Sequence, residues 1–135
     1  MNLPCCLRHA LAALLVLPAG ALACSCRPAS LSERVTLAEI VLVAVVVDAQ
    51  PLRQVTLKSK EIFKGHAGEL LTIHTGESDC DFFLPPLQPR AGDEYLLYVG
   101  RSDNRLFISR CQNSGLAAER KAELQELRKL RRARP

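Results

Sequence analysis

Two cysteines separated by a single residue, Cys24 and Cys26, are the feature that most constrains the fold of this chain. Such close neighbours rarely bond to each other because the geometry is strained, so each is expected to reach a distant cysteine. Downstream the chain has two further cysteines, Cys80 and Cys111. Two connectivities follow, Cys24–Cys80 with Cys26–Cys111, or the reverse pairing. Either one fastens residues 24–26 to the rim of the folded domain, and each closed loop contributes about 4 kcal/mol in the chain-entropy model.

Residues 1–23 have the organisation of a secretory signal peptide. Arg8 precedes an apolar run at 10–17, and Ala21-Leu22-Ala23 has the small-x-small pattern of a cleavage site. The run is shorter than the roughly 20 residues that cross a membrane, so no transmembrane segment is predicted. We expect a secreted protein, extracellular or periplasmic, that begins at Cys24. Its remaining cysteines are even in number, which is typical of disulfides in an oxidising compartment.

Lipidation of Cys24 is the alternative outcome of export, and it would anchor the protein to a membrane. Two observations argue against it. Ala21 is smaller than the aliphatic residue expected at that position of a lipoprotein signal. Lipidation would also use the Cys24 thiol and leave an odd number of cysteines, one of them unpaired.

Length and charge limit the class of protein. The 135 residues suffice for one domain, which we place at residues 24–115, followed by a basic helical tail at 116–135. The net charge is +4, but the positive excess lies in the tail and the domain is close to neutral. Aromatic residues are also scarce, with four Phe, two Tyr and no Trp. A nucleic-acid partner is therefore not predicted, because neither a basic groove nor a stacking platform is present.

The hydrophobic pattern predicts a mainly β domain. The spacing Ser30-Leu31-Ser32-Glu33 is that of a capping box and predicts a short helix at this point. The run Ile40–Val47 is β-branched and continuous, which is typical of a strand buried on both faces. Four further strands are predicted at Val55–Lys60, Leu70–Thr75, Glu94–Val99 and Leu106–Ser109.

Five short strands are expected to close into a barrel, because closure removes exposed strand edges. Residues 76–90 contain three prolines and are interpreted as a long loop. Leu116–Leu130 contains good helix formers, and Leu124, Leu127 and Leu130 are expected to face the barrel. The predicted fold class is thus a small five-stranded, OB-like closed barrel with a short N-terminal helix and a C-terminal helix.

No set of residues points to catalysis. His66 and His74 belong to no His-Glu-x-x-His pattern, and the chain has no Gly-x-Ser-x-Gly turn and no phosphate-binding glycine loop. Asp79 and Asp81 flank Cys80 and are interpreted as solvated loop residues. The sequence therefore predicts a protein that is not an enzyme and has neither a cofactor nor a metal of its own.

Several short motifs, in order, resemble the N-terminal inhibitory domain of the tissue inhibitors of metalloproteinases, a netrin-like module with an OB-type barrel. They span about residues 24–111 and are Cys24-Ser25-Cys26-Arg27-Pro28, the valine-rich 41–49, Lys60-Glu61-Ile62-Phe63-Lys64-Gly65, Glu77-Ser78-Asp79-Cys80, Glu94-Tyr95-Leu96-Leu97 with Gly100, and Leu106-Phe107-Ile108-Ser109-Arg110-Cys111. The most specific part is the Cys-x-Cys pair directly after the cleavage site, followed by Phe-Lys-Gly and Glu-Ser-x-Cys.

The resemblance implies a zinc metalloproteinase as partner. In that family the α-amino group and carbonyl oxygen of the residue matching Cys24 chelate the catalytic zinc of the protease, and the Ser25 side chain points into the pocket beside it. Glu77, Ser78 and Asp79 would form an adjacent contact ridge. The disulfides implied are Cys24–Cys80 and Cys26–Cys111. The chemistry is reasonable, because a catalytic zinc keeps a position open and an α-amine, with a pKa of about 7.7–8, loses its proton readily near neutral pH.

The chain departs from the family in four respects. The stretch between the first two predicted strands is short, so a long hairpin is not expected. The third disulfide of the family's domain is missing, and the basic tail replaces the second subdomain of the animal members. Asp79 also places a charge where the animal inhibitors usually have an apolar residue.

Two other functions fit the cysteine pattern. A non-inhibitory netrin-like module, held by the same two disulfides, would bind a protein or a polysaccharide. A Cys-x-Cys metal carrier or thiol enzyme would need reduced thiols. The tail at 116–135 has two interpretations of its own, a solvated helix face or a contact with anionic surfaces such as lipid or polysaccharide.

Overall fold

A computed structural model describes residues 25–50, 54–74 and 89–133 of the chain. The elements in these ranges are α1 (Leu31–Leu37), β1 (Ile40–Gln50), β2 (Gln54–Lys64), β3 (Leu70–His74), β4 (Glu94–Ser102), β5 (Arg105–Ile108), the 3-10 turn η2 (Arg110–Gln112), β6 (Gly115–Leu116), the 3-10 turn η3 (Ala117–Glu119) and α2 (Lys121–Arg132). The mainly β class and the helices at the two ends agree with the sequence prediction.

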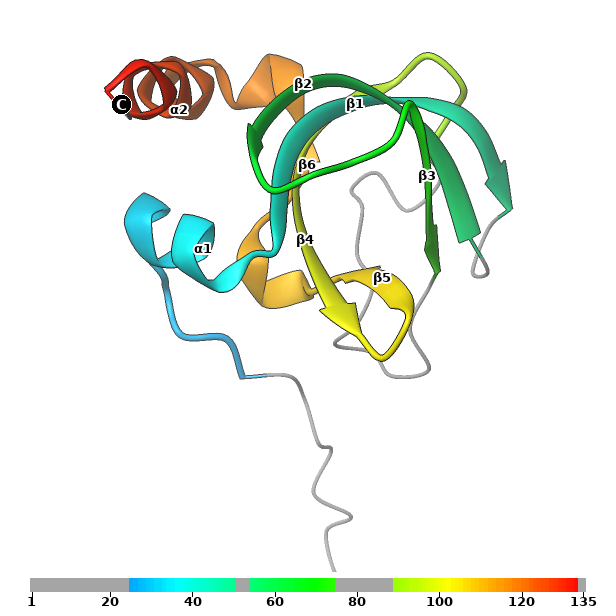
Figure 1. The fold of residues 1–135 in the computed structure, drawn as a ribbon, viewed down its shortest axis with the longest axis horizontal. Helices are drawn as coiled ribbons and strands as arrows, with labels where there is room; N and C mark the ends of the chain where they lie inside the picture. Colours follow the sequence, from blue (N-terminus) through cyan, green and yellow to red (C-terminus); the bar gives the residue numbers. More distant parts are fainter. Residues whose placement is uncertain (1–24, 51–53, 75–88, 134–135) are drawn as a thin grey trace, which may run out of the picture.

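The strands form one antiparallel sheet in the order β3-β2-β1-β4-β5, and the short β6 pairs with β4. The sheet curls into a half-barrel, with both helices on its outer side (Figure 1). The register between β1 and β2 shifts at three places, and irregularities of this kind increase the twist of a sheet. The curl brings β3 and β5 within 8 Å of each other, Cα to Cα, although no ladder joins these strands in the described ranges.

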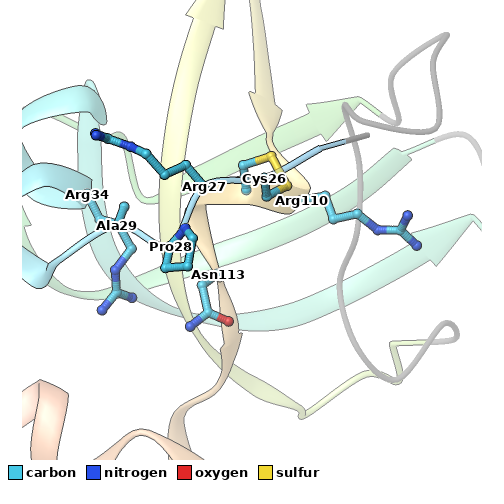
Figure 2. A pocket seen from close by; sticks show the side chains of 8 residues that line it. Cys26, Arg27, Pro28, Ala29, Arg34, Arg110 and Asn113 are labelled. Atoms are coloured by element: carbon cyan, nitrogen blue, oxygen red, sulfur yellow. A yellow bond between two sulfur atoms is a disulfide. The ribbon is translucent and has the colours of Figure 1, made fainter. Parts of the chain in front are cut away.

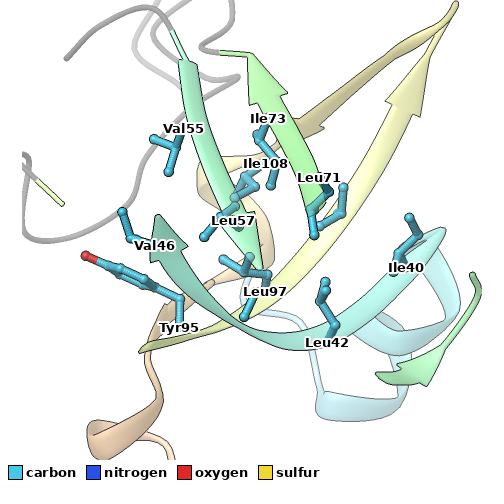
Figure 3. Packing of buried hydrophobic residues seen from close by; sticks show 12 residues of the cluster. Ile40, Leu42, Val46, Val55, Leu57, Leu71, Ile73, Tyr95, Leu97 and Ile108 are labelled. Carbon is cyan, nitrogen blue, oxygen red and sulfur yellow. The ribbon is translucent and has the colours of Figure 1, made fainter. Parts of the chain in front are cut away.

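The predicted burial of β1 on both faces is confirmed from Ile40 to Val46 apart from the half-buried Val45, whereas Val47 is exposed. Successive residues of a strand point to opposite faces, so β1 and β4 each supply two separate cores. The inner core lies inside the curl (Figure 3) and takes from these two strands Ile40, Leu42, Ala44, Val46, Tyr95, Leu97 and Val99. The outer core takes Val41, Val43, Leu96 and Tyr98 and lies beneath the helices.

The C-terminal helix begins later than predicted. Leu116 pairs with Tyr95 of β4 as part of β6, and Ala117 is buried in the outer core as part of η3, so α2 starts only at Lys121. Leu124 and Leu127 are buried in the outer core, but Leu130 is 46% exposed, which corrects its predicted position. Steps of three residues drift around a helix of 3.6 residues per turn, so the third leucine has rotated away from the sheet.

Ion pairs also attach α2 to β2. Arg128 and Arg131 both contact the carboxylate of Glu61, at 2.8 Å and 3.0 Å. The hydrogen bond from Arg128, together with the charges of both arginines, lowers the pKa of Glu61 despite its partial burial. The guanidinium of Arg131 also lies 5.4 Å from the centre of the Phe63 ring. Part of the basic tail is therefore bound to its own sheet.

The N-terminal helix is fixed at both ends. Its predicted capping box is confirmed, because the Ser30 hydroxyl accepts from the Glu33 amide and the Glu33 carboxylate accepts from the Ser30 amide. At the other end Lys64 Nζ donates to the carbonyl oxygens of Val35, Thr36 and Ala38, at 2.8, 3.0 and 2.6 Å. This cation satisfies carbonyl groups that a helix terminus leaves unpaired.

Gly65, directly after Lys64, allows β2 to end close to the start of β1. Its φ angle is +76°, and a Cβ at this position would lie 2.4 Å from the carbonyl oxygen of Glu39. The conformation and the space both require glycine. Phe63, Lys64 and Gly65 therefore act together, as a buried ring, a helix cap and a close backbone approach.

Replacing Lys64 by methionine should destabilise the domain by about 1–3 kcal/mol, because it keeps the apolar stem but leaves the partly buried carbonyls of Val35 and Ala38 without their cation. Urea unfolding would measure the change. Lys58→Met is the matched control, since Lys58 lies on the same strand in an exposed pair with Glu69. The control should change stability by less than about 0.5 kcal/mol. Equal losses in the two variants would contradict the capping role.

Candidate functional site

The segment before α1 crosses the rim of the sheet and is bonded to it. Cys26 forms a disulfide with Cys111, which is 85 residues away in sequence, and their Cα atoms are 5.1 Å apart. Cys111 lies in the η2 turn that follows β5, where the Ser109 hydroxyl accepts a hydrogen bond from its amide. Residues 25–28 are exposed and have no regular secondary structure. The disulfide therefore holds an exposed segment in one place on the sheet rim.

An open hollow of about 320 Å³ lies beside this disulfide (Figure 2). Its lining consists of Cys26, Arg27, Pro28, Ala29, Arg34, Arg110, Cys111 and Asn113. The charged lining residues are all arginines, and no carboxylate is among the described residues of the lining. Three arginines thus line the hollow together with the disulfide, Pro28 and Ala29.

A buried polar cluster supports the hollow from the side of α2. Arg34 Nη1 lies 2.7 Å from Glu123 Oε1, with only 11% and 13% of the two side chains exposed. The Tyr98 hydroxyl donates a hydrogen bond to the same carboxylate oxygen, and the Arg34 guanidinium lies 5.0 Å from the centre of the Tyr98 ring. Burial, and then the hydrogen bond and charge of Glu123, raise the pKa of Tyr98 well above its ordinary value of about 10.

Polar contacts fix the turn after Cys111 to β4 and to the residue that precedes α2. Asn113 adopts a left-handed conformation with φ of 58°, and its side-chain oxygen accepts from Arg120 Nη2 at 2.8 Å. Buried Ser114 accepts from the Tyr98 amide at 2.9 Å. The disulfide is thus attached to a well-packed part of the sheet.

The sequence-predicted site is described only in part. Ser25 is exposed directly before Cys26, and the Cys26–Cys111 bond is the pairing that the resemblance implied for these two residues. Cys24, the ridge Glu77, Ser78 and Asp79, and the partner Cys80 lie outside the described residues. His66 and His74 are both exposed.

The sequence did not indicate Arg34, Arg110 and Asn113 as lining residues. It also did not indicate Glu123 as the partner of Arg34. A weak signal existed for Arg110, because it adjoins a cysteine that was expected to be bonded. Arg34 and Glu123 are 89 residues apart, and no local pattern connects them.

The part of the chain that the structure describes contains no group of three or more His, Cys, Asp or Glu side chains placed to hold a metal ion. None of its helices has the length and apolar character needed to span a membrane.

A comparison with models of known protein families gives no match, and a search of curated proteins gives none either.

The buried cluster makes a prediction about Glu123. Replacing it by glutamine should cost about 3 kcal/mol of folding stability, because the Arg34 charge loses its partner while it stays buried. The pKa of Tyr98 should fall, because the acceptor charge that favours its neutral form is removed. Absorbance titration can follow this, since the chain has two tyrosines and no tryptophan. Burial raises the pKa of the other tyrosine, Tyr95, to about 12, and it serves as the internal reference.

Both tyrosines have raised pKa values in the folded protein, and this sets the direction in which folding stability depends on pH. Below a pH of about 10 the two neutral phenols contribute fully to the stability of the fold. As the pH rises further, the tyrosines of the unfolded chain ionise first, and this contribution is lost. Glu126→Gln is the control, since Glu126 lies on the same helix in an exposed pair with Lys129. An unchanged pKa of Tyr98 in the Glu123→Gln variant would contradict the effect that we assign to the Glu123 carboxylate.

Proposed function

We propose that this protein is a secreted inhibitor of zinc metalloendopeptidases that resembles the tissue inhibitors of metalloproteinases. The α-amine and carbonyl oxygen of Cys24 chelate the zinc of the protease, and Ser25 enters the mouth of the pocket beside it. Glu77, Ser78 and Asp79 supply further contacts. The zinc belongs to the protease, and the inhibitor itself performs no reaction.

The observation that carries this proposal is the position of Ser25. It is exposed, it directly follows Cys24, and it directly precedes a cysteine that is bonded to the sheet rim. The Cys26–Cys111 disulfide limits the conformations open to the chain next to Cys24, and this lowers the entropy that chelation would cost relative to a free peptide. Small size at Ser25 also suits entry into a narrow pocket.

The zinc chemistry needs a free amine at Cys24. A catalytic zinc has three protein ligands and one position for water, which a neutral amine and a carbonyl oxygen can take over. The amine must lose its proton first, and this costs little near neutral pH because its pKa is about 7.7–8. If the N-terminus were blocked or extended, the nitrogen of Cys24 would be an amide and its lone pair would not be available to the zinc.

The proposal includes two finer points of architecture and location. The curled sheet is proposed to be an OB-like barrel closed across β3 and β5, which approach within 8 Å, Cα to Cα. Export is proposed from the signal-like residues 1–23 and agrees with the Cys26–Cys111 disulfide, because such bonds persist in oxidising compartments. The Cys24–Cys80 disulfide would complete the attachment of the segment.

Extension of the N-terminus by one alanine tests the mechanism. The exported chain is first shown by intact mass and N-terminal sequencing to begin at unmodified Cys24. It is then assayed against zinc endopeptidases of the His-Glu-x-x-His class, with thermolysin as reference. The free chain should inhibit at least one of them, and the extended chain should lose inhibition by about a hundredfold or more, since both chelating atoms are displaced.

The control carries the same alanine after Pro135 and should inhibit like the free chain. Inhibition that survives the N-terminal extension would contradict chelation by Cys24. A free chain that inhibits no member of the panel would favour the other candidate, a netrin-like module that binds without inhibiting. Its binding should then be indifferent to either extension.

A further inference from the structure

The Glu33 carboxylate joins the N-terminus of α1 to the exposed segment that precedes it. Its Oε2 atom accepts hydrogen bonds from the Ser30 amide at 2.8 Å and from the Ser30 hydroxyl at 3.0 Å. Its Oε1 atom accepts a hydrogen bond from Arg27 Nη2 at 3.1 Å. The capping box therefore uses one carboxylate oxygen, and the other holds Arg27. We call this Arg27–Glu33 ion pair the latch.

The disulfide by itself leaves the direction of the segment open. It holds the Sγ atom of Cys26 against Cys111, but the backbone of Cys26 can still turn about the single bonds between its Cα and Sγ atoms. A second contact close to Cys26 restricts this rotation. Arg27 directly follows Cys26, so its attachment to Glu33 supplies that contact on the side of α1.

The latch is fastened to a helix whose position is fixed. Two residues, Pro28 and Ala29, separate Arg27 from the N-cap of α1. The proline ring holds φ at about −65°, which makes this connection stiff. Further along α1, Arg34 forms its buried pair with Glu123 of α2. A contact made to α1 therefore positions the segment relative to the whole domain.

The latch is an ion pair at neutral pH. Hydrogen bonds from the Ser30 amide and hydroxyl, and then the charge of Arg27, lower the pKa of Glu33 from its ordinary value of about 4.5. The charged groups of α1 and α2 that face each other, Arg34 and Glu123, are paired with one another. Because the Arg27 and Glu33 side chains are 82% and 46% exposed, water competes for them and the latch is of modest strength.

We propose that Glu33 is a positioning residue, which through the latch fixes the direction in which the chain leaves Cys26 toward Ser25. Where it concerns inhibition, this inference rests on the proposed function, because a fixed direction presents the Cys24 amine to the zinc of the protease. As a statement about this chain, it needs only the latch and not the zinc chemistry.

Two single variants test the latch. Glu33→Gln keeps an oxygen for the Ser30 amide, because glutamine also completes a capping box, but it removes the charge that holds Arg27. Arg27→Gln leaves the whole cap in place. In each variant the ¹⁵N order parameter of Ser25 should fall below the value of about 0.85 that is typical of a rigid backbone. Inhibition of the protease panel should weaken by about two- to fivefold, as expected for an exposed ion pair.

The double variant Arg27→Gln, Glu33→Gln should lose no more than either single variant, because both changes remove the same contact. A pH titration adds a readout that a purely structural role would not move. The Arg27 Nε–Hε signal and the Ser25 amide signal should shift together, with a midpoint below about 4.5. The latch is complete above this range and is lost as the pH falls through the lowered pKa of Glu33. The shared transition should be absent in Glu33→Gln.

Glu69→Gln is the matched control, since Glu69 forms an exposed pair with Lys58 of β2 at 3.2 Å. It should leave both the order parameter of Ser25 and the inhibition unchanged. An unchanged order parameter of Ser25 in Arg27→Gln would overturn the proposal. Losses that simply add in the double variant would overturn it as well, because the two residues would then act independently.

The two proposals can fail separately, because the relaxation and pH measurements need no protease. A looser segment in both single variants, together with a native chain that inhibits nothing, would keep the latch and remove the zinc mechanism. Inhibition that is present in the native chain and equally strong in both variants would overturn the positioning role alone.

Discussion

The pairing of β1 with β4 is the constraint on which the rest of the structure depends. Both strands are buried on both faces, so the same two strands close the inner core inside the curl and the outer core beneath the helices. Loss of either core would therefore expose apolar residues of both strands. The uninterrupted apolar run of β1 is needed for this double role, because an alternating strand could serve only one core.

The candidate site is built on the edge of this double core. β5 pairs with β4 and leads directly into the η2 turn, so the position of Cys111 is set by the sheet. The disulfide then transfers that position to Cys26. From the other side, Glu123 of α2 holds Arg34 of α1, and Lys64 of β2 caps α1. The exposed segment is thus held by the sheet and by both helices.

Local signals in the sequence were sufficient for some of these features. The capping box at Ser30 depends on residues three apart, and the burial of Ile40–Val46 depends on the composition of one run. The start of the C-terminal helix was harder to predict, because Leu116 joins the sheet through a pairing with Tyr95 that no local pattern reveals. Of the site, Ser25, Cys26 and Cys111 were found through the cysteine pattern. Arg34 and Glu123 were not, because their pairing depends on how the two helices meet on the sheet.

The central claim is that the disulfide fixes the exposed segment before any partner binds. Backbone ¹⁵N relaxation of residues 25–29 in the isolated protein tests this most directly, with the double variant Cys26→Ser, Cys111→Ser as comparison. We predict order parameters near 0.85 in the native protein and below about 0.6 in the variant, with the sheet unchanged in both. Order parameters below about 0.6 in the native protein would contradict the claim, as would equal values in the two proteins.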